Sequence, residues 1–173
     1  GSKLAQSDRV AVTRHTAQET SARVSTGASD SNEATILHED EEILVVNKPA
    51  GLLSIPSAPG MGDSEDTVLG RVREYMTFKH GHRTYVGMLH RLDRDTSGLL
   101  LFASSAAIRD QLQANWVDVS KIYLAVVEGK PHQDQGTIEN FLKEGRDLRV
   151  RKTRDEAGAR QAITHYRVVA ERH

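Results

Sequence analysis

Residues 90–102 read His-Arg-Leu-Asp-Arg-Asp-Thr-Ser-Gly-Leu-Leu-Leu-Phe, a dense polar cluster followed by an apolar run. A polar cluster that closes with Thr-Ser-Gly is typical of a loop, and the apolar run at 98–102 predicts a buried strand. Loops held by a rigid strand often carry functional groups. Two arginines flank the Asp93 carboxyl group, and positive neighbours favour its ionised form. Asp93 is therefore a candidate nucleophile or base, and Arg91 and Arg94 are candidate partners for a polyanion.

The length and composition predict one globular domain. The 173 residues suffice for a substantial core, although 38% hydrophobic residues and a mean hydropathy of −0.51 put the chain on the polar side. The absence of cysteine excludes disulfides and thiolate metal sites and fits a reducing compartment. No apolar run approaches the roughly 20 residues of a membrane span, and the N-terminus lacks the apolar core of a secretory signal. We therefore expect a cytoplasmic protein without a membrane partner.

The net charge is −1 and the isoelectric point is about 6.8, which is not the basic signature of a nucleic-acid-binding protein. The charge is unevenly distributed along the chain. Residues 30–42 contain six acidic residues and no lysine or arginine, whereas basic residues outnumber acidic ones by six to three in 71–100 and by eight to four in 143–167. This distribution is compatible with a positive face, although composition alone favours an ordinary mixed surface.

Residues 1–34 are expected to lie outside the folded domain. Gly1 and Ser2 resemble a tag remnant, and the residues up to 34 are rich in serine, threonine, alanine and charge, which is typical of a disordered leader. The composition changes at Ile36, so we expect the folded domain to span residues 35–173.

The periodicity of apolar residues predicts strands and helices that intermix without a regular β-α-β rhythm. Strands are expected at 43–46, 98–102, 121–129 and 162–170, and amphipathic helices are expected with apolar residues at Val68, Val72, Tyr75 and Met76 and at Ile108, Leu112 and Trp116. We expect Ser64 or Asp66 to cap the first helix, and Ser104 or Ser105 to cap the second. The predicted fold class is α+β, with a mixed, mainly antiparallel sheet and flanking helices and loops.

The polar cluster resembles the active-site motif of the RluA-type pseudouridine synthases, His-Arg-Leu-Asp-x-x-Thr-Ser-Gly, over the nine positions 90–98. This resemblance implies a pseudouridine synthase catalytic domain that isomerises uridine to pseudouridine in structured RNA. Asp93 takes the place of the family's catalytic carboxylate, and Arg91 that of the arginine that fills the gap left by the flipped uridine. The same resemblance gives supporting roles to His90, Thr96 and Ser97.

Two further segments resemble the same family. Residues 43–52 are similar to its opening strand and Lys-Pro-x-Gly turn, which implies that Lys48 supports the active site. Residues 121–129 are similar to its Lys-x-Tyr-x-Ala-x-Val-x-Gly strand, whose tyrosine stacks on the target pyrimidine and is discussed as the base that removes a ring proton. Tyr123 is therefore the second expected catalytic residue. From the residues alone, a lysine before proline is usually part of a turn, and one tyrosine in a strand usually fills a core.

The resemblance implies RNA as the partner, ribosomal RNA first and transfer RNA second, for a monomeric enzyme that needs no cofactor and no metal. Basic side chains are expected to position the RNA through phosphate contacts, which carry no sequence information. They are Arg94, Arg71, Arg73, Lys79 and Arg83.

One motif of the family is missing from this sequence. The family places Thr-Gly-Arg-x-His-Gln-Ile-Arg soon after the strand expected at 162–170, and the arginine of that motif pairs with the catalytic aspartate. The sequence ends at His173, before any such motif. We therefore expect the catalytic domain to be incomplete at its C-terminal end, and the sequence leaves open whether this chain alone is active.

Three alternatives stay open at this point. The polar cluster by itself also fits a solvated turn, in which surface ion pairs contribute at most about 1 kcal/mol each. A metal hydrolase site is conceivable, although the spacing matches none of the recurring zinc patterns; its ligands would come from His80, His82, His90, Asp93 and Asp95. The third alternative is a catalytically silent RNA-binding module on the same fold.

Overall fold

The computed structural model describes residues 22–24, 33–58, 60, 65–145, 150–153 and 157–171. The chain divides into two compact units, which we describe separately as the N-terminal unit, Ala17–Val117, and the C-terminal unit, Asp118–His173. No helix among the described residues has the length and apolar character required to cross a lipid bilayer.

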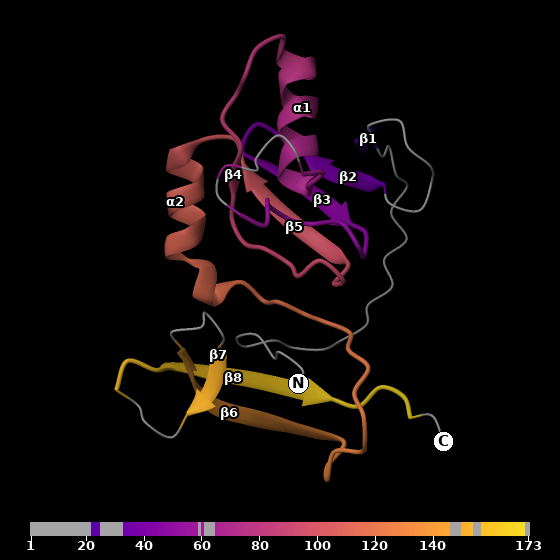
Figure 1. The fold of residues 1–173 in the computed structure, drawn as a ribbon, viewed down its shortest axis with the longest axis vertical. Helices are drawn as coiled ribbons and strands as arrows, with labels where there is room; N and C mark the ends of the chain where they lie inside the picture. The colour runs from indigo at the N-terminus through magenta and orange to yellow at the C-terminus, as the bar shows by residue number, and fades with distance from the viewer. Residues whose placement is uncertain are drawn as a thin grey trace. The chain divides into compact units, whose positions relative to one another are not determined.

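The N-terminal unit contains an antiparallel sheet of five strands in the order β1-β2-β3-β5-β4 (Figure 1). The strands are β1 (Ala22–Val24), β2 (Ala34–Glu39), β3 (Ile43–Lys48), β4 (Gly87–Met88) and β5 (Gly98–Ala103). The strands expected at 43–46 and 98–102 are thus confirmed, each with short extensions. The short β1 lies within the segment expected to be a leader, and the other residues of 1–32 lie outside the described chain, so the boundary at residue 34 stays a prediction.

One face of this sheet is buried because the apolar residues of the central strands fall in register. Val46 pairs with Ile36 of β2 on one side and with Leu100 of β5 on the other, while Leu44 pairs with Phe102. Residues that pair across antiparallel strands share a face, and all five of these side chains are almost completely buried. The β-branched and aliphatic run of β3 therefore forms the centre of the core.

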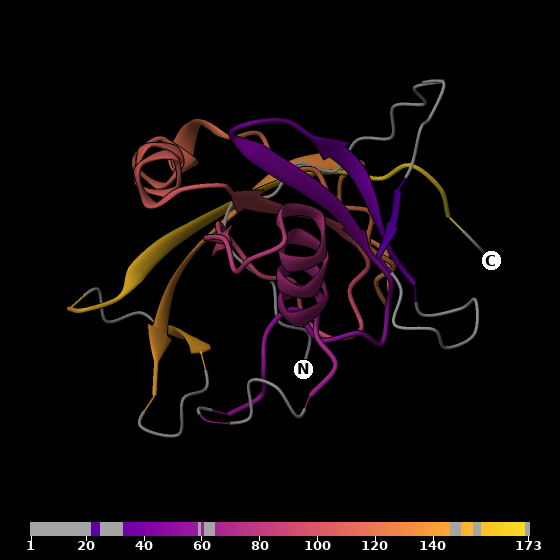
Figure 2. The same cartoon turned by 90° about the horizontal axis from the view of Figure 1, so that it is seen from above.

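Helix α1 (Val68–His80) packs on this core through Val68 and Val72, and Figure 2 views it almost end-on beside the sheet. The expected cap was wrong: the N-cap is Thr67, whose hydroxyl oxygen accepts a hydrogen bond from the Gly70 amide at 3.0 Å. Asp66 instead binds the Arg71 side chain, and Ser64 lies outside the described residues. Threonine, serine and aspartate are all suited to capping, so composition alone does not distinguish neighbouring positions.

Helix α2 (Ala106–Ala114) begins as expected at Ser105, whose hydroxyl oxygen accepts a hydrogen bond from the Ile108 amide. Trp116 lies beyond the helix, in the short 3-10 helix η1 (Trp116–Asp118).

The C-terminal unit contains a three-stranded antiparallel sheet in the order β7-β6-β8, formed by β6 (Gln135–Glu144), β7 (Val150–Thr153) and β8 (Arg160–Arg167). The strand expected at 162–170 is confirmed in type but begins and ends earlier. The strand expected at 121–129 is wrong, since the backbone there is irregular apart from a single bridge at Ile122. Among the described residues no named strand pairs with this segment, and alternation of apolar residues by itself does not fix the backbone conformation.

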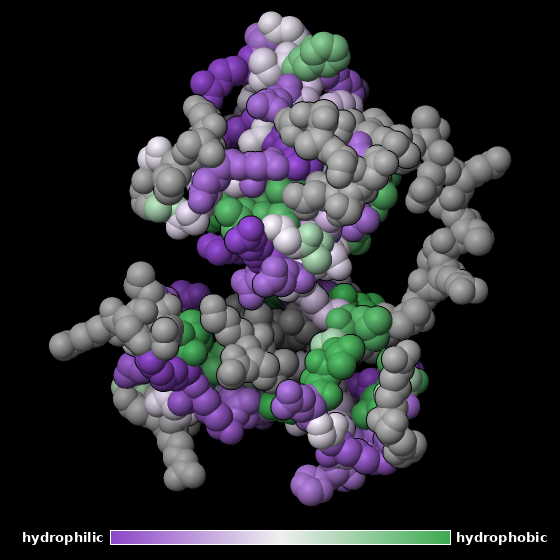
Figure 3. Space-filling model, turned by 45° about the vertical axis from the view of Figure 1, so that its right-hand side comes forward, coloured by the Kyte–Doolittle hydropathy of each residue, from purple (hydrophilic) through white to green (hydrophobic). Residues whose placement is uncertain are grey.

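Apolar side chains consequently remain on the surface of the C-terminal unit (Figure 3). Val126 is fully exposed, and Leu124 and Val127 are 69% and 62% exposed. The two α-helices and the antiparallel sheets of the described residues confirm the predicted α+β class.

Candidate active site

The polar cluster is a loop that leads into β5, as the sequence predicts, and it connects β5 to the short strand β4, which the sequence analysis does not predict. The Leu89 amide donates to the Leu101 carbonyl at 3.0 Å, and the Thr96 amide donates to the Asp93 carbonyl at 3.1 Å, which closes a tight turn. In Figure 1 this connection runs below β5, at the end of the N-terminal unit opposite the C-terminal end of α1. The Asp93 side chain is exposed, whereas the preceding Leu92 is buried in the core. The Asp93 carboxylate is therefore exposed to solvent, while hydrogen bonds and the buried Leu92 hold the backbone around it in place.

The first anchor is the side chain of Ser54. Its hydroxyl donates to the Leu92 carbonyl at 2.6 Å, and its oxygen accepts from the Leu92 amide at 3.1 Å. Ser54 is buried, and its own carbonyl accepts a bond from the Leu69 amide near the start of α1. One hydroxyl therefore satisfies both main-chain groups of the residue before Asp93.

The second anchor is Lys48, at the end of β3, whose side chain is completely buried. Its ammonium donates to the carbonyl of Arg94 at 2.8 Å, and also to those of Pro49 and Leu52. Burial lowers the pKa of Lys48, while the negative charges of Asp95 and Asp93 act in the opposite direction. A buried cation therefore lies beneath the turn and within electrostatic reach of both of its carboxylates.

Gly51 completes the anchorage of Arg94. The Gly51 amide donates to the Arg94 carbonyl at 2.8 Å, and the Gly51 carbonyl accepts from Nε of Arg94 at 3.0 Å. Gly51 has a φ of 88°, a conformation that side chains with a Cβ rarely adopt. The Lys-Pro-Ala-Gly turn thus forms hydrogen bonds with the residue after Asp93, and Ser54 forms hydrogen bonds with the residue before it.

The other expected residues of the motif surround this turn. Arg91, Arg94 and Ser97 are exposed, and Thr96 is half-buried. The His90 ring stacks on the Trp116 ring, with centroids 5.1 Å apart, and so connects the motif to the segment after α2.

The basic residues expected to contact phosphate divide into separate groups. Arg71 is buried, and its guanidinium binds the Asp66 carboxylate through two nitrogens, so it supports the start of α1 rather than presenting a cation to RNA. Lys79 pairs with Glu39 at 2.9 Å, near the end of α1 that lies opposite the Asp93 turn. Arg73 and Arg83 are exposed on and beyond this helix. Only Arg91 and Arg94 belong to the turn itself.

Tyr123 belongs to the C-terminal unit, in the irregular segment before β6, and it is half-buried there. Its pairing with Asp93, which belongs to the other unit, stays a prediction.

The geometry of the described residues does not support the alternative of a metal site. Within the described part of the chain, which includes all five expected ligands, no three His, Asp or Glu side chains lie close enough together to hold a metal ion.

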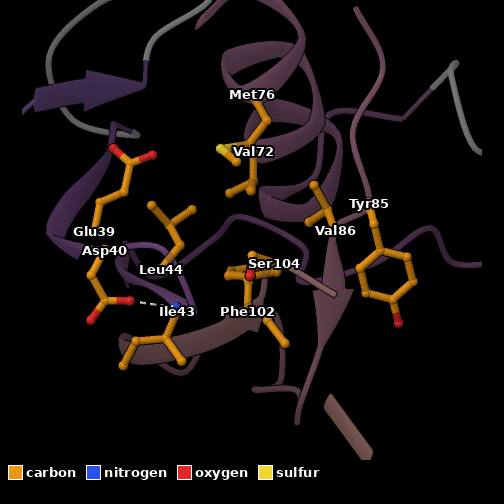
Figure 4. A pocket seen from close by; sticks show the side chains of 11 residues that line it. Glu39, Asp40, Ile43, Leu44, Val72, Met76, Tyr85, Val86, Phe102 and Ser104 are labelled. Atoms are coloured by element: carbon orange, nitrogen blue, oxygen red, sulfur yellow. Dashed lines mark hydrogen bonds between the residues drawn. The ribbon is translucent and has the colours of Figure 1, made fainter. Parts of the chain in front are cut away.

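A pocket between α1 and β5 is separate from the motif at 90–98 (Figure 4). Its lining includes Leu44, Met76 and Phe102, and none of its lining residues belongs to segment 89–97.

Sequence reasoning missed Ser54 as part of this site, whereas Gly51 belongs to the Lys-Pro-x-Gly turn that the family resemblance already places at the active site. The available signal was a single serine after the apolar pair Leu52–Leu53, since a buried hydroxyl needs a hydrogen-bonding partner.

Comparison with known proteins identifies the family. The family model described as RNA pseudouridylate synthase matches residues 42–173. The uncharacterized RNA pseudouridine synthase YhcT of Bacillus subtilis is 35% identical over 141 residues, which cover 80% of this chain and 45% of that protein. Ribosomal large subunit pseudouridine synthase D of Borreliella burgdorferi is 30% identical over 140 residues, 78% of this chain and 42% of that protein. The chain therefore belongs to the RNA pseudouridylate synthase family, in its RluA-type group.

The fold agrees with a solved structure, that of human RNA pseudouridylate synthase domain containing 4. The TM-score is 0.56 at 22% sequence identity, and the match covers 79% of this chain and 54% of the human one. The present chain spans less than half the length of the two curated relatives named above.

Proposed function

We propose that the protein isomerises uridine to pseudouridine in structured RNA, with Asp93 as the catalytic carboxylate. The observation that carries this proposal is the exposed Asp93 side chain on a backbone that Ser54 and Lys48 anchor on both sides. A reaction at a single carboxylate needs that group to be held in place and open to a nucleoside. Membership of the family supports the same assignment.

The proposed chemistry breaks one bond and forms another. The Asp93 carboxylate attacks C1′ of the ribose or promotes elimination there, and the C1′–N1 bond breaks with the electron pair going to the uracil ring. The ring rotates, and C5 bonds to C1′ as the Asp93 carboxylate leaves C1′; on the elimination route, the proton that Asp93 took from C2′ returns to C2′ as this bond forms. The C5 proton is then removed and N1 ends protonated, so that the reaction needs no oxidant, reductant or water.

The remaining residues take roles around this step. The target uridine must leave its stack, which costs a few kcal/mol, and Arg91 fills the gap that it leaves. Tyr123 stacks on the freed ring and removes the C5 proton. Arg94, Arg73, Lys79 and Arg83 contact phosphate, whereas Arg71 is left out because it is buried against Asp66. Lys48, His90, Thr96 and Ser97 support the turn.

The proposal also includes the setting of the reaction. Ribosomal RNA is the first expected substrate, because several relatives are named ribosomal large subunit pseudouridine synthases. We propose a monomeric, cytoplasmic enzyme whose catalytic domain begins at residue 35.

The test uses the full-length gene product and ribosomal RNA transcribed with 5-tritiated uridine. We expect the wild-type protein to release tritium and Asp93→Asn to lower the rate by at least about 10³-fold, as loss of a catalytic nucleophile does. The matched control is Asp95→Asn, which removes an exposed carboxylate from the same turn and should keep most of the activity.

Equal rates for the two variants would overturn the role of Asp93. RNA binding by the wild-type protein without tritium release from any RNA tested would instead establish the catalytically silent RNA-binding module.

A further inference from the structure

Helix α2 brings the chain back to the motif at 90–98 after β5 has led away from it. The helix lies beside β4 and β5, and in Figure 1 it descends from the end of β5 towards the level of the motif. The nine residues of α2 advance about 14 Å at 1.5 Å per residue. This distance is enough to bring Trp116, which follows the helix, beside His90 at the start of the motif.

Hydrogen bonds at both ends hold α2 and therefore the backbone that carries Trp116. Before the helix, the hydroxyl of Ser104 donates to the Glu41 carbonyl at 2.6 Å. At its end, the side-chain amide of Asn115 donates to the Gln111 carbonyl at 2.9 Å. The residue directly before Trp116 is thus fixed to the helix, so that the indole ring projects from a defined place.

The indole ring of Trp116 contacts the imidazole ring of His90. Their centroids lie 5.1 Å apart and their planes are inclined by 31°, within the range of favourable aromatic pairs. Both residues are half-buried. On either side of His90, Leu89 and Leu92 are buried, whereas Arg91 is exposed. Two leucines and one ring contact therefore hold this segment, while the arginine side chain stays open to solvent.

The proposed reaction depends on where the groups of the motif lie. Arg91 has to enter the gap left by the uridine and Asp93 has to reach C1′, and a misplacement of about 1 Å can lower a rate by about 10²-fold. Ser54 and Lys48 hold the main chain on the two sides of the aspartate. Trp116 acts at a third point, the first residue of the motif.

We propose that Trp116 is a positioning residue of the active site, because its ring holds the His90 ring and thereby fixes the main chain that leads to Asp93. The inference rests on the proposed function. Trp116 lies outside all three segments that resemble the family, and sequence analysis expects it only on the apolar side of a helix. In this role it touches no substrate and acts through His90.

The first test measures tritium release by variants of the full-length gene product. Trp116→Leu keeps an apolar side chain but removes the ring, and Trp116→Phe keeps an aromatic ring. Val117→Ala is the matched control, because Val117 is 86% exposed in the same 3-10 helix. His90→Ala is measured alone and together with Trp116→Leu. Circular dichroism and thermal melts check that each variant is folded at the assay temperature.

We expect Trp116→Leu to lower kcat by about 10–100-fold and to change KM for RNA by less than about threefold, since the proposed phosphate contacts remain. Trp116→Phe should stay within about threefold of the wild type, and Val117→Ala should match it. The double variant should be no slower than the slower of its two single variants, because both remove one shared contact.

Three kinetic results would overturn the proposal. The first is an unchanged kcat in folded Trp116→Leu. The second is a double variant whose loss is the product of the two single losses, since the rings would then act independently. The third is a KM raised by more than about tenfold with kcat intact, which would make Trp116 a direct RNA contact.

A second test needs no turnover and no substitution at Trp116. The 173-residue chain contains a single tryptophan, so its fluorescence reports on this ring alone. We expect His90→Ala to shift the emission to longer wavelength, because water reaches the indole when the imidazole is removed. His82→Ala, in the turn after α1, is the control and should leave the emission unchanged. Equal emission in wild type and His90→Ala would overturn the inference.

The two tests separate this inference from the proposed function. A wild-type protein that shows the emission shift on His90→Ala but releases no tritium from any RNA would contradict the proposed function and support the contact between Trp116 and the motif. An active wild type whose Trp116→Leu variant is equally active would contradict the inference alone.

Discussion

The hydroxyl of Ser54 binds both main-chain groups of the residue before Asp93. It donates to the carbonyl of Leu92 and accepts from the amide of the same residue, in a buried environment. A buried main-chain group that loses its partner costs about 1–3 kcal/mol, more than a typical hydrogen bond contributes when formed.

We therefore predict that Ser54→Ala lowers the free energy of unfolding by about 1–3 kcal/mol. Urea denaturation at a constant slope would measure this loss. Ser97→Ala is the control, because Ser97 is exposed on the same connection and its replacement should change stability by less than about 0.5 kcal/mol. Equal losses in the two variants would show that the Ser54 bonds contribute nothing specific.

The contacts of this hydroxyl also mark the limit of prediction at the residue scale. The motif around Asp93 is continuous in sequence, so its residues and their loop could be predicted. Ser54 and Lys48 contact it from 38 and 46 positions away, respectively, and only the supporting role of Lys48 is expected, from the family resemblance and not from periodicity. Such contacts depend on the pairing of β3 with β5, which periodicity within one segment does not reveal.

At the scale of elements, the turn between β2 and β3 is stabilised by one carboxylate. Oδ1 of Asp40 accepts from the amides of Glu42 at 2.8 Å and Ile43 at 2.7 Å, and Oδ2 contacts the His38 ring. These hydrogen bonds lower the pKa of Asp40 from 3.8 to about 2, and the bond from the Ile43 amide has the largest effect. A carboxyl group whose pKa is lower in the folded state stabilises the fold when it is ionised.

We predict that Asp40→Ala lowers the melting temperature above pH 3.8 and that the difference from wild type shrinks as the pH falls towards 2. The sign follows because the unfolded chain takes up the proton first, so that the stabilisation is lost as the pH drops through the folded pKa. Thermal melts at a series of pH values would measure it, with Glu41→Ala as the control in the same exposed turn. A difference that persists unchanged to pH 2 would contradict the assignment.

Elements with a clear apolar period were predictable, and those without one were not. The core strands β3 and β5 and helix α1 have buried apolar side chains, and in α2 the apolar residues Ile108 and Leu112 are half-buried. All four elements lie close to the places expected from the sequence. The sequence of β6, Gln-Gly-Thr-Ile-Glu-Asn-Phe-Leu-Lys-Glu, alternates poorly because Ile138 and Leu142 face one side and Phe141 faces the other. Residues 121–129 alternate better, yet their backbone is irregular apart from the bridge at Ile122, because alternation within one segment does not determine its backbone conformation.

At the scale of the whole molecule, surface composition and net charge bear on solution behaviour. The net charge of −1 gives little electrostatic repulsion between molecules near neutral pH. Exposed apolar side chains that lie close together favour association or partner binding. Leu124, Val126 and Val127 are such a group, and Val126 is fully exposed.

We predict that Leu124→Ser with Val126→Ser raises the concentration at which the protein stays dispersed and lowers the fluorescence of a bound hydrophobic dye, without lowering the melting temperature. Dynamic light scattering and dye titration would measure the effect. Phe78→Ser is the control, since Phe78 is 91% exposed but lies on α1 of the N-terminal unit. A fall in melting temperature of the double variant would show that these side chains are covered in solution.

The two anchors of the Asp93 turn also constrain how this protein can change. Lys48 binds the main chain of Arg94 and Ser54 binds that of Leu92. The number of residues between these two anchored positions of the turn is therefore fixed. An added or deleted residue there would leave one anchor out of reach and shift the carboxylate relative to any bound nucleoside. Evolution and engineering can therefore exchange side chains within this turn, but they must leave its residue count untouched.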